Sequence, residues 1–270
     1  MNERSVQDRL ELAVDAGCEA GRTTLEHFGR ADLQVERKSD ASPVTVADRR
    51  AEEYLRARIT AAFPDDGIFG EEFPETQGTS GYRWIVDPID GTQSFIHAVP
   101  LYGTLVGVEH EGQCVIGVIV MPALDEYVYA AVGQGAWYVR ENDSPRRAAV
   151  SAVEKVSEAM LVTTSFKLFE ETGKREPFER LSAAVRVDRY WGDCYGYLLV
   201  ATGRADVMVD PVVSPWDVAA VKPILEEAGG SFTDWRGNRT IYAGEGIGTN
   251  GHILDEVIAL TGDANEERRT

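Results

Sequence analysis

The segment that most constrains this chain is an apolar run, Trp84-Ile85-Val86, that leads directly into Asp87-Pro88-Ile89-Asp90-Gly91-Thr92. The run predicts a buried β-strand, and Pro88, which lacks an amide hydrogen, predicts that the strand stops pairing there. Two carboxylates three residues apart would then lie where a strand opens into a loop, the usual place for chemistry on an α/β scaffold. Such close carboxylates repel unless protons or a cation intervene, and they suit Mg²⁺ bound together with a substrate phosphate.

The glycine and the threonine of this segment support the same interpretation. Gly91 allows the backbone to approach an anion, and Thr92 supplies a hydroxyl that can position a water molecule. Asp, Pro and Gly are also ordinary turn residues, so a polar turn is the alternative interpretation of the six residues taken alone.

Charge and composition exclude several classes of protein. The formal net charge of −18 opposes a nucleic-acid groove, which needs a basic field. No apolar run approaches the roughly 20 residues of a membrane span, and residues 1–9 lack the basic and apolar parts of a signal peptide. The three cysteines form no CxxC pair. We therefore expect a cytoplasmic protein with no membrane or nucleic-acid partner.

The first half of the chain reads as helices followed by a β-meander. Helical spacing of apolar residues predicts helices over 6–28 and 46–62. Alternating apolar residues with intervening turn signals predict strands over 103–109, 114–120, 127–132 and 136–139. The polar segment 141–145 predicts a boundary between an N-terminal α+β domain, residues 1–145, and a C-terminal α/β domain, residues 146–270.

The second half alternates short apolar strands with helices, which predicts α/β layering. The predicted strands are 160–163, 205–209 and 231–233, and the predicted helices are 177–184, 192–202 and 215–228. Pro223 lies inside the last helix and should kink it.

Two further motifs accompany the first one. Gly70-Glu71-Glu72 follows Phe63-Pro64-Asp65-Asp66, and Ser214-Pro215-Trp216-Asp217 precedes Val218-Ala219-Ala220. In order and spacing, and with Glu226-Glu227-Ala228-Gly229-Gly230, the chain resembles the inositol monophosphatase family, the Mg²⁺-dependent and lithium-sensitive phosphomonoesterases. The resemblance runs from Leu10 to Leu260 and implies a layered α-β-α-β-α sandwich.

The resemblance also implies the roles of individual residues. The implied ligands of two or three Mg²⁺ ions are the carboxylates of Glu71, Asp87, Asp90 and Asp217 and the carbonyl of Ile89. Glu71 and Thr92 would hold and deprotonate the attacking water, with Asp90 as a third catalytic group, and the amides of Gly91 and Thr92 would bind the phosphate. The family pattern further implies a small phosphomonoester substrate, inhibition by lithium and a homodimer.

Two of these acids fit a structural role as well. Ser214 and Asp217 have the spacing of a helix capping box, with Pro215 at the first helical position. Asp48 matches an acid that supports the metal site in the family, but an acid in the first turn of a helix is also favoured by the helix dipole. Gly244-Glu245-Gly246-Ile247-Gly248 resembles a nucleotide loop without the strand and helix around it, and we interpret it as a turn before a strand.

The segment 189–197 indicates the substrate. It carries Gly192 and Asp193 among aromatic residues and resembles the branch of the family that hydrolyses histidinol phosphate in histidine biosynthesis. Asp193 and Asp210 could pair with the cationic alcohol of that ester, and Trp191 or Tyr195 could stack on its imidazole or else pack in the core.

Other functions remain open at this point. The first alternative is an inositol-1-monophosphatase or a broad-range sugar or polyol phosphatase, since the substrate residues are less specific than the metal ligands. Aspartyl-phosphate chemistry uses two acids that stand two residues apart, whereas Asp87 and Asp90 stand three apart. A non-catalytic interaction protein is a further alternative, against which the full ligand set weighs.

Overall fold

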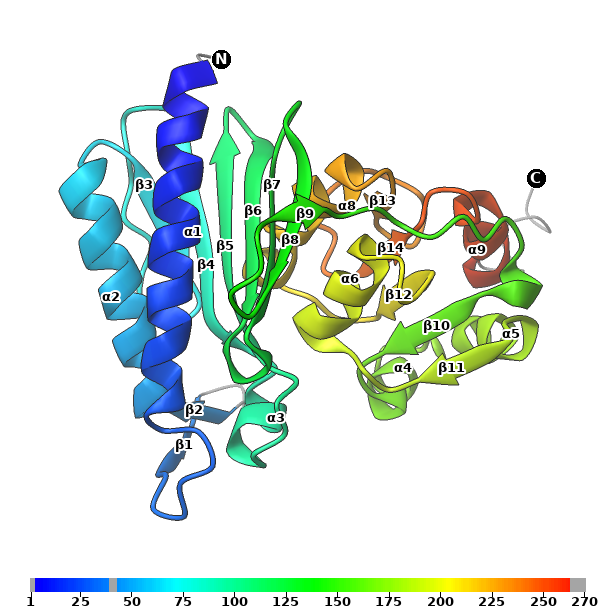
Figure 1. Ribbon diagram of the computed structural model, residues 1–270. Helices are drawn as coiled ribbons and strands as arrows, with labels where there is room; N and C mark the ends of the chain where they lie inside the picture. Colours follow the sequence, from blue (N-terminus) through cyan, green and yellow to red (C-terminus); the bar gives the residue numbers. More distant parts are fainter. Residues whose placement is uncertain (1–2, 39–42, 263–270) are drawn as a thin grey trace.

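The two large β-sheets and three layers of helices stack in the order helix, sheet, helix, sheet, helix (Figure 1). The structure, a computed structural model, describes residues 3–38 and 43–262. The predicted α-β-α-β-α sandwich is therefore confirmed.

The first sheet has seven strands in the order β3-β4-β5-β6-β7-β8-β9. The strands β3 and β4 are parallel, and every later neighbour is antiparallel, as expected for a meander. Glu111 and Gly112 make the turn between β5 and β6 at φ values of 50° and 80°, the left-handed pair that suits the twist of a hairpin. The strands are β3 Gly67–Gly70, β4 Tyr82–Asp90, β5 Gly103–His110, β6 Gln113–Met121, β7 Glu126–Ala131, β8 Gly135–Arg140 and β9 Arg146–Arg147.

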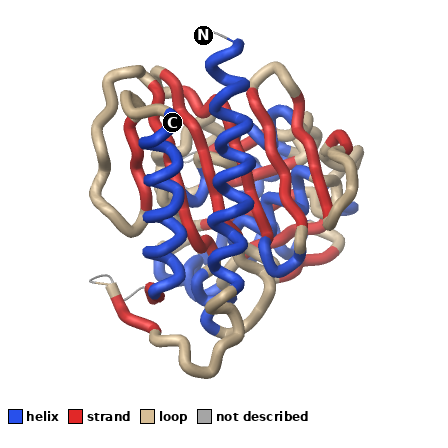
Figure 2. Tube along the Cα trace, turned by 60° about the vertical axis from the view of Figure 1, so that its left-hand side comes forward, coloured by secondary structure: helices blue, strands red, loops and turns tan. Residues whose placement is uncertain are grey.

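Helices α1 (Glu3–Leu25) and α2 (Val46–Ala62) cover the outer face of this sheet, as Figure 2 shows. The predicted bounds of α2 are confirmed. A Cβ on Gly17 would lie 3.4 Å from a methyl group of Val106, so the small residues of α1 let it pack closely on the strands. The short strands β1 (Val35–Arg37) and β2 (Pro43–Thr45) pair with each other before α2 begins. Residues 39–42 lie outside the described residues.

The second sheet has five strands in the order β11-β10-β12-β14-β13. Its parallel strands are β10 (Met160–Thr163), β11 (Val187–Arg189) and β12 (Val207–Asp210), while β13 (Ser231–Thr233) and β14 (Gly246–Thr249) complete it with antiparallel pairs.

Helices α6, α7 and α8 lie between the two sheets, and α4, α5 and α9 cover the far face of the second sheet (Figure 1). The expected helix over 215–228 is divided in two at Ala219 and Ala220, because Pro223 has no amide hydrogen to donate four residues back. The remaining helices are α3 Thr92–Ile96, α4 Phe166–Glu171, α5 Arg175–Ala184, α6 Asp193–Ala201, α7 Pro215–Val218, α8 Val221–Glu227 and α9 Leu254–Thr261, with 3₁₀ turns at Pro122–Leu124 and Val156–Glu158.

Strand β4 belongs to two hydrophobic cores at once. Trp84 and Val86 pack with α1 and α2, whereas Ile85 packs with α6 and α8 on the other face. Asp87 follows Ile85 by two residues and therefore faces the second half of the chain.

The prediction that β4 ends at Pro88 is wrong. The strand continues to Asp90 because a bulge accommodates the proline: Asp87 pairs with Leu105 and Asp90 with Gly103. The hydroxyl of Thr104 donates to the carbonyl of Pro88 at 2.8 Å. Both acids thus stand on a hydrogen-bonded strand rather than on a free loop.

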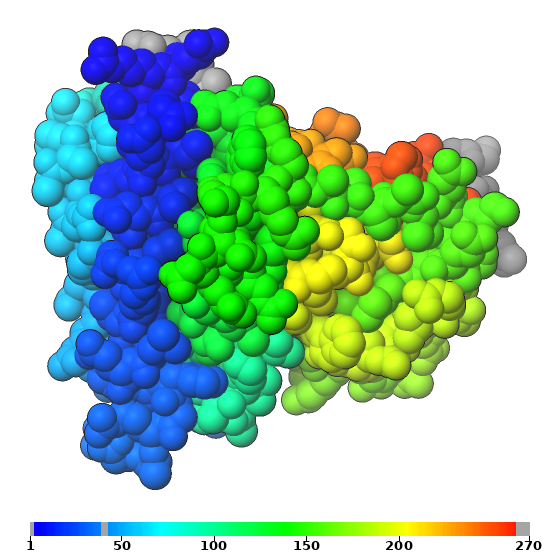
Figure 3. Space-filling model, in the orientation of Figure 1, coloured from blue at the N-terminus to red at the C-terminus, as the bar shows by residue number. Residues whose placement is uncertain are grey.

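The two halves of the chain are in contact over a broad front, and Figure 3 shows the blue and cyan residues on one side and the yellow to red residues on the other. Tyr242, between β13 and β14, donates to Glu109 of the first sheet at 2.6 Å and accepts a bond from Arg83. Among the helices of the described residues, none combines the length and the apolar character needed to cross a bilayer.

Candidate active site

Three carboxylates from the two halves of the chain meet at the end of β4. One oxygen from each of Asp87, Asp90 and Asp217 lies within 4.8 Å of the other two. Asp217 comes from the first turn of α7, where its Oδ2 accepts the Ser214 amide at 2.7 Å, so it caps the helix and faces the other acids at the same time. Trp216 packs edge-on against Phe69 of β3 at 5.2 Å and so anchors α7 beside the first sheet.

The electrostatics of this cluster favour a bound cation. Burial, followed by the neighbouring acids, raises the pKa of Asp87 and of Asp90 well above the usual value for aspartate. Loss of water contact also raises the pKa of Asp217 to about 7. Since a hard divalent ion would favour the charged forms and prefers oxygen ligands, this donor set fits such an ion.

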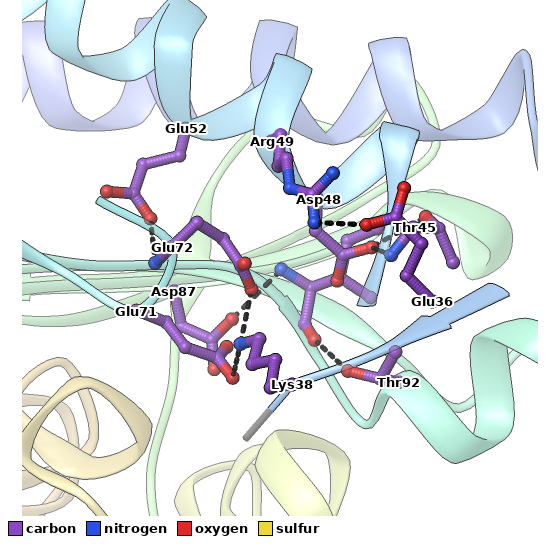
Figure 4. Close-up of polar contacts among 11 residues, drawn as sticks. Glu36, Lys38, Thr45, Asp48, Arg49, Glu52, Glu71, Glu72, Asp87 and Thr92 are labelled. Atoms are coloured by element: carbon purple, nitrogen blue, oxygen red, sulfur yellow. Dashed lines mark hydrogen bonds and ion pairs between the residues drawn. The ribbon is translucent and has the colours of Figure 1, made fainter. Parts of the chain in front are cut away.

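Glu71 lies next to the cluster and is paired with a lysine (Figure 4). Nζ of Lys38 donates to Glu71 Oε1 at 2.7 Å and to Glu72 Oε1 at 2.6 Å. Burial raises the pKa of Glu72 to about 7, despite the opposing effect of Lys38. A cation thus already partly neutralises this edge of the site.

Glu52 holds the Glu71 loop in place, a role that was not predicted from the sequence. Glu52 is fully buried on α2, is paired with Arg56 at 2.8 Å and accepts the amide of Glu72 at 2.8 Å (Figure 4). A Cβ on Gly70 would lie 2.2 Å from its carboxylate. The glycine before Glu71 is therefore required by the approach of Glu52, a long-range contact that no local pattern indicates.

Asp48 completes a capping box at the start of α2. Its Oδ2 accepts the amide of Thr45 at 2.8 Å and the hydroxyl of Thr45 at 2.6 Å, whereas Oδ1 is buried with no partner among the described residues. Burial raises the pKa of Asp48. Asp48 thus lies in the first turn of α2, as the alternative interpretation predicts, and one of its oxygens has no partner among the described residues.

One amide and one hydroxyl connect the end of β4 to the turn that follows it. Asp87 Oδ1 accepts the amide of Ile89 at 2.9 Å, and the carbonyl of Ile89 accepts the hydroxyl of Thr92 at 3.1 Å. Gly91 has a φ of 81°, and a Cβ there would lie 3.0 Å from Asp193 Oδ2. Only glycine meets both requirements, the left-handed backbone and the close contact.

A small cavity of about 80 Å³ adjoins the carboxylates on the side of α6. Asp193 and Asp210 contribute to its wall, and burial raises their pKa values to about 7 and about 6. Asp193 has a φ of 52°, so an aspartate is held in a left-handed backbone at the start of α6. Next to it, Gly192 packs so closely that a Cβ would lie 2.5 Å from Cα of Thr164. The complete lining is Asp90, Thr164, Leu168, Asp193, Cys194, Tyr197, Asp210, Val212, Val213 and Asp217.

The aromatic residues expected to contact a substrate do not line this cavity. Tyr195 is partly buried and packs against the hydrophobic core, which is the alternative role expected for it, and the guanidinium of Arg204 lies 5.9 Å from the centre of its ring. Trp191 is 41% exposed. Thr164 and Tyr197 line the cavity instead, and both were missed. The hydroxyl of Thr164 donates to Asp210.

The chain is similar to known proteins both in sequence and in fold. The profile described as "Inositol monophosphatase family" matches residues 5–266. A histidinol-phosphatase of Chlorobaculum parvum is 48% identical, with 96% of this chain and 98% of the relative covered. An inositol-1-monophosphatase of Rhizobium meliloti is 35% identical, with 92% and 95% covered. The solved structure of the extragenic suppressor protein suhB from Bartonella henselae superposes with a TM-score of 0.87 at 31% identity, covering 95% of this chain and 99% of that one.

Proposed function

The chain belongs to the inositol monophosphatase family and is a phosphomonoesterase, and from that premise we propose that it hydrolyses L-histidinol phosphate to L-histidinol and phosphate. The single observation that carries this proposal is the pair of carboxylates, half-buried Asp193 and buried Asp210, in the cavity beside the carboxylate cluster. A neutral polyol offers such acids only hydrogen bonds, whereas an ammonium group favours their charged forms and forms stronger, charge-assisted bonds. The 48% identity to a histidinol-phosphatase supports the same substrate.

We propose that the ligands of Mg²⁺ are Glu71, Asp87, Asp90, Asp217 and the carbonyl of Ile89. When bound there, two or three such ions supply positive charge to the phosphate and to the departing oxygen. Lithium, which would compete for the same oxygens, should inhibit the enzyme.

The chain's own residues position the reaction. Glu71 accepts a proton from the attacking water, and the hydroxyl of Thr92 orients that water with it. The water oxygen forms the new bond to phosphorus while the bond from phosphorus to the ester oxygen breaks on the opposite side, and that oxygen takes a proton from solvent water and leaves as the alcohol. The amides of Gly91 and Thr92 hold the phosphate, while Asp90 is held by the amide of Cys194 and by the strand beneath it. We propose that Gly192 lines the path of the alcohol and that Asp48 supports this arrangement from α2.

A substrate series tests the proposal directly. The values of kcat/KM should be highest for histidinol phosphate and lower for inositol 1-phosphate and glycerol 2-phosphate. Expression of the chain should also restore growth of a histidine auxotroph that lacks this phosphatase, whereas the Asp90→Asn variant should not. A preference of the purified enzyme for inositol 1-phosphate would favour instead the activity named for the Rhizobium meliloti relative.

We further propose a cytoplasmic homodimer whose protomers each contain the two domains 1–145 and 146–270. Light scattering at micromolar concentration measures the mass, and a value of one chain would exclude the dimer. Limited proteolysis within 141–145, followed by separate expression of each half, would test the domain boundary.

A further inference from the structure

The hydroxyl of Tyr197 is buried beside Asp210 and makes no hydrogen bond of good geometry to any described residue. The residue lies on α6, is 2% exposed, and contributes to the cavity that also contains Asp193 and Asp210. A buried polar group without a partner is unfavourable for folding, so its presence in this place needs an explanation.

Two glycines of β14 make the space for this side chain. Gly246 and Gly248 lie on the same face of the strand, because side chains alternate along it. A Cβ on Gly246 would lie 2.9 Å from the Tyr197 hydroxyl oxygen, and a Cβ on Gly248 would lie 2.9 Å from Cδ1 of the ring. The glycine-rich segment 244–248 is therefore not a nucleotide loop: two of its glycines form a slot for an aromatic ring.

The ring has little freedom to turn away from the cavity. Phe232 of β13 packs edge-on against it, with the ring centroids 6.0 Å apart at an interplanar angle of 62°. Burial, and next the charge of Asp210, raise the pKa of Tyr197 well above its usual value. The hydroxyl thus keeps its proton and is held at a fixed position beside Asp210.

We propose that Tyr197 is a substrate-binding residue whose hydroxyl bonds the polar group of the substrate's alcohol that faces Asp210. A hydroxyl has one donor and two acceptor positions, and an ammonium group has donors only. The ammonium group therefore donates to the Tyr197 oxygen, and the Tyr197 proton points to the Asp210 carboxylate. This inference rests on the proposed function for the identity of the ammonium group, but the position of the hydroxyl does not depend on it.

The variant Tyr197→Phe removes one oxygen and keeps the ring that fills the slot. With this variant we expect KM for histidinol phosphate to rise about fivefold or more while kcat stays within about twofold of wild type. For 3-(imidazol-4-yl)propyl phosphate, which lacks the amino group, KM should change by less than about twofold.

Thermal stability distinguishes this role from a structural one. Because the hydroxyl makes no hydrogen bond of good geometry in the free enzyme, Tyr197→Phe should melt close to the wild-type temperature or above it. Tyr138→Phe is the matched control: its buried hydroxyl donates to Glu126, away from the cavity. This control should lower Tm by roughly 2–4 °C and leave both KM values unchanged.

Two results would overturn the proposal. One is a Tyr197→Phe protein that loses as much stability as Tyr138→Phe, since the hydroxyl would then be a structural partner of Asp210. The other is an equal change in KM for the two esters. If wild type prefers inositol 1-phosphate, the proposed function fails, and the variant is then compared on that ester and on propyl phosphate. A KM increase confined to the inositol ester would still support the binding role.

Discussion

Replacing Asp210 with asparagine removes one negative charge from the substrate cavity and changes little else. The amide oxygen of asparagine can still accept the Thr164 hydroxyl, so the contact with β10 should survive. At pH 8 the wild-type carboxyl, with a pKa of about 6, is ionised and can pair with an ammonium group.

The expected loss follows from the strength of that contact. A hydrogen bond to a charged group contributes about 1.5–3 kcal/mol, which corresponds to about a 10- to 150-fold rise in KM for histidinol phosphate. Because the contact is the same in the ground state and the transition state, kcat should change little. For glycerol 2-phosphate, whose alcohol is neutral, we expect less than about a threefold change in KM.

Steady-state kinetics at pH 8 on both esters measure the difference. Asp206→Asn is the matched control: this buried acid immediately before β12 accepts the Met160 amide at 2.6 Å and does not line the cavity. It should lower stability without changing either KM. Equal losses on the two esters in Asp210→Asn would refute the reasoning, because Asp210 would then support the site in general.

Four further outcomes follow from the acidic residues of the site and the turn after β4. Asp90→Asn should lower kcat by about 100-fold or more while the protein stays folded, because one of several repelling charges is removed; loss of the circular dichroism spectrum would instead make Asp90 a structural residue. Thr92→Ala should lower kcat more than it raises KM, since orientation of the water matters chiefly in the transition state; an unchanged kcat would show that Glu71 alone manages the water. Exhaustive chelation should abolish turnover, and Mg²⁺ should restore it. In the chelated protein, burial raises the pKa values of Asp193 and Asp217 to about 7, above their unfolded values. The contribution of these two acids to the free energy of unfolding is therefore complete below pH 4 and is lost as pH rises towards about 7. Tm should be higher at pH 5 than at pH 8, and a lower Tm at pH 5 in a melting series would contradict this reasoning.

Sequence patterns predicted those helices and turns whose conformation depends on residues close together in the sequence. Helix α2 begins and ends where the periodicity of apolar residues indicates, and the hairpin turn at Glu111 and Gly112 follows from the residues themselves. The strand at Asp87 was extended beyond expectation because Pro88 lies in a bulge, which depends on the partner strand β5. A pairing between distant strands is not contained in the local sequence.

The same distinction applies to the site. The motifs around Glu71, Asp87 and Asp217 are contiguous in sequence and were recognised, and the structure brings Asp87, Asp90 and Asp217 together. Glu52 and Tyr197 were missed because each acts across a long sequence separation, the first on the loop after Gly70 and the second against β14. Steric contacts at Gly70 and at the two glycines of β14 indicate these side chains, and such contacts are visible only once the chain is folded.

The position of β4 between two cores has a consequence for how this protein tolerates mutation. Trp84 and Val86 pack on one side of the strand and Ile85 on the other, and the same strand carries Asp87 and Asp90. Volume changes in either core are felt by the backbone, because close-packed interiors transmit strain. A comprehensive library of single substitutions scored for growth should therefore show a band of intolerant apolar positions along β4 and its neighbours. Many of these variants would remain folded and lose activity, although none of the substituted side chains lies in the substrate cavity.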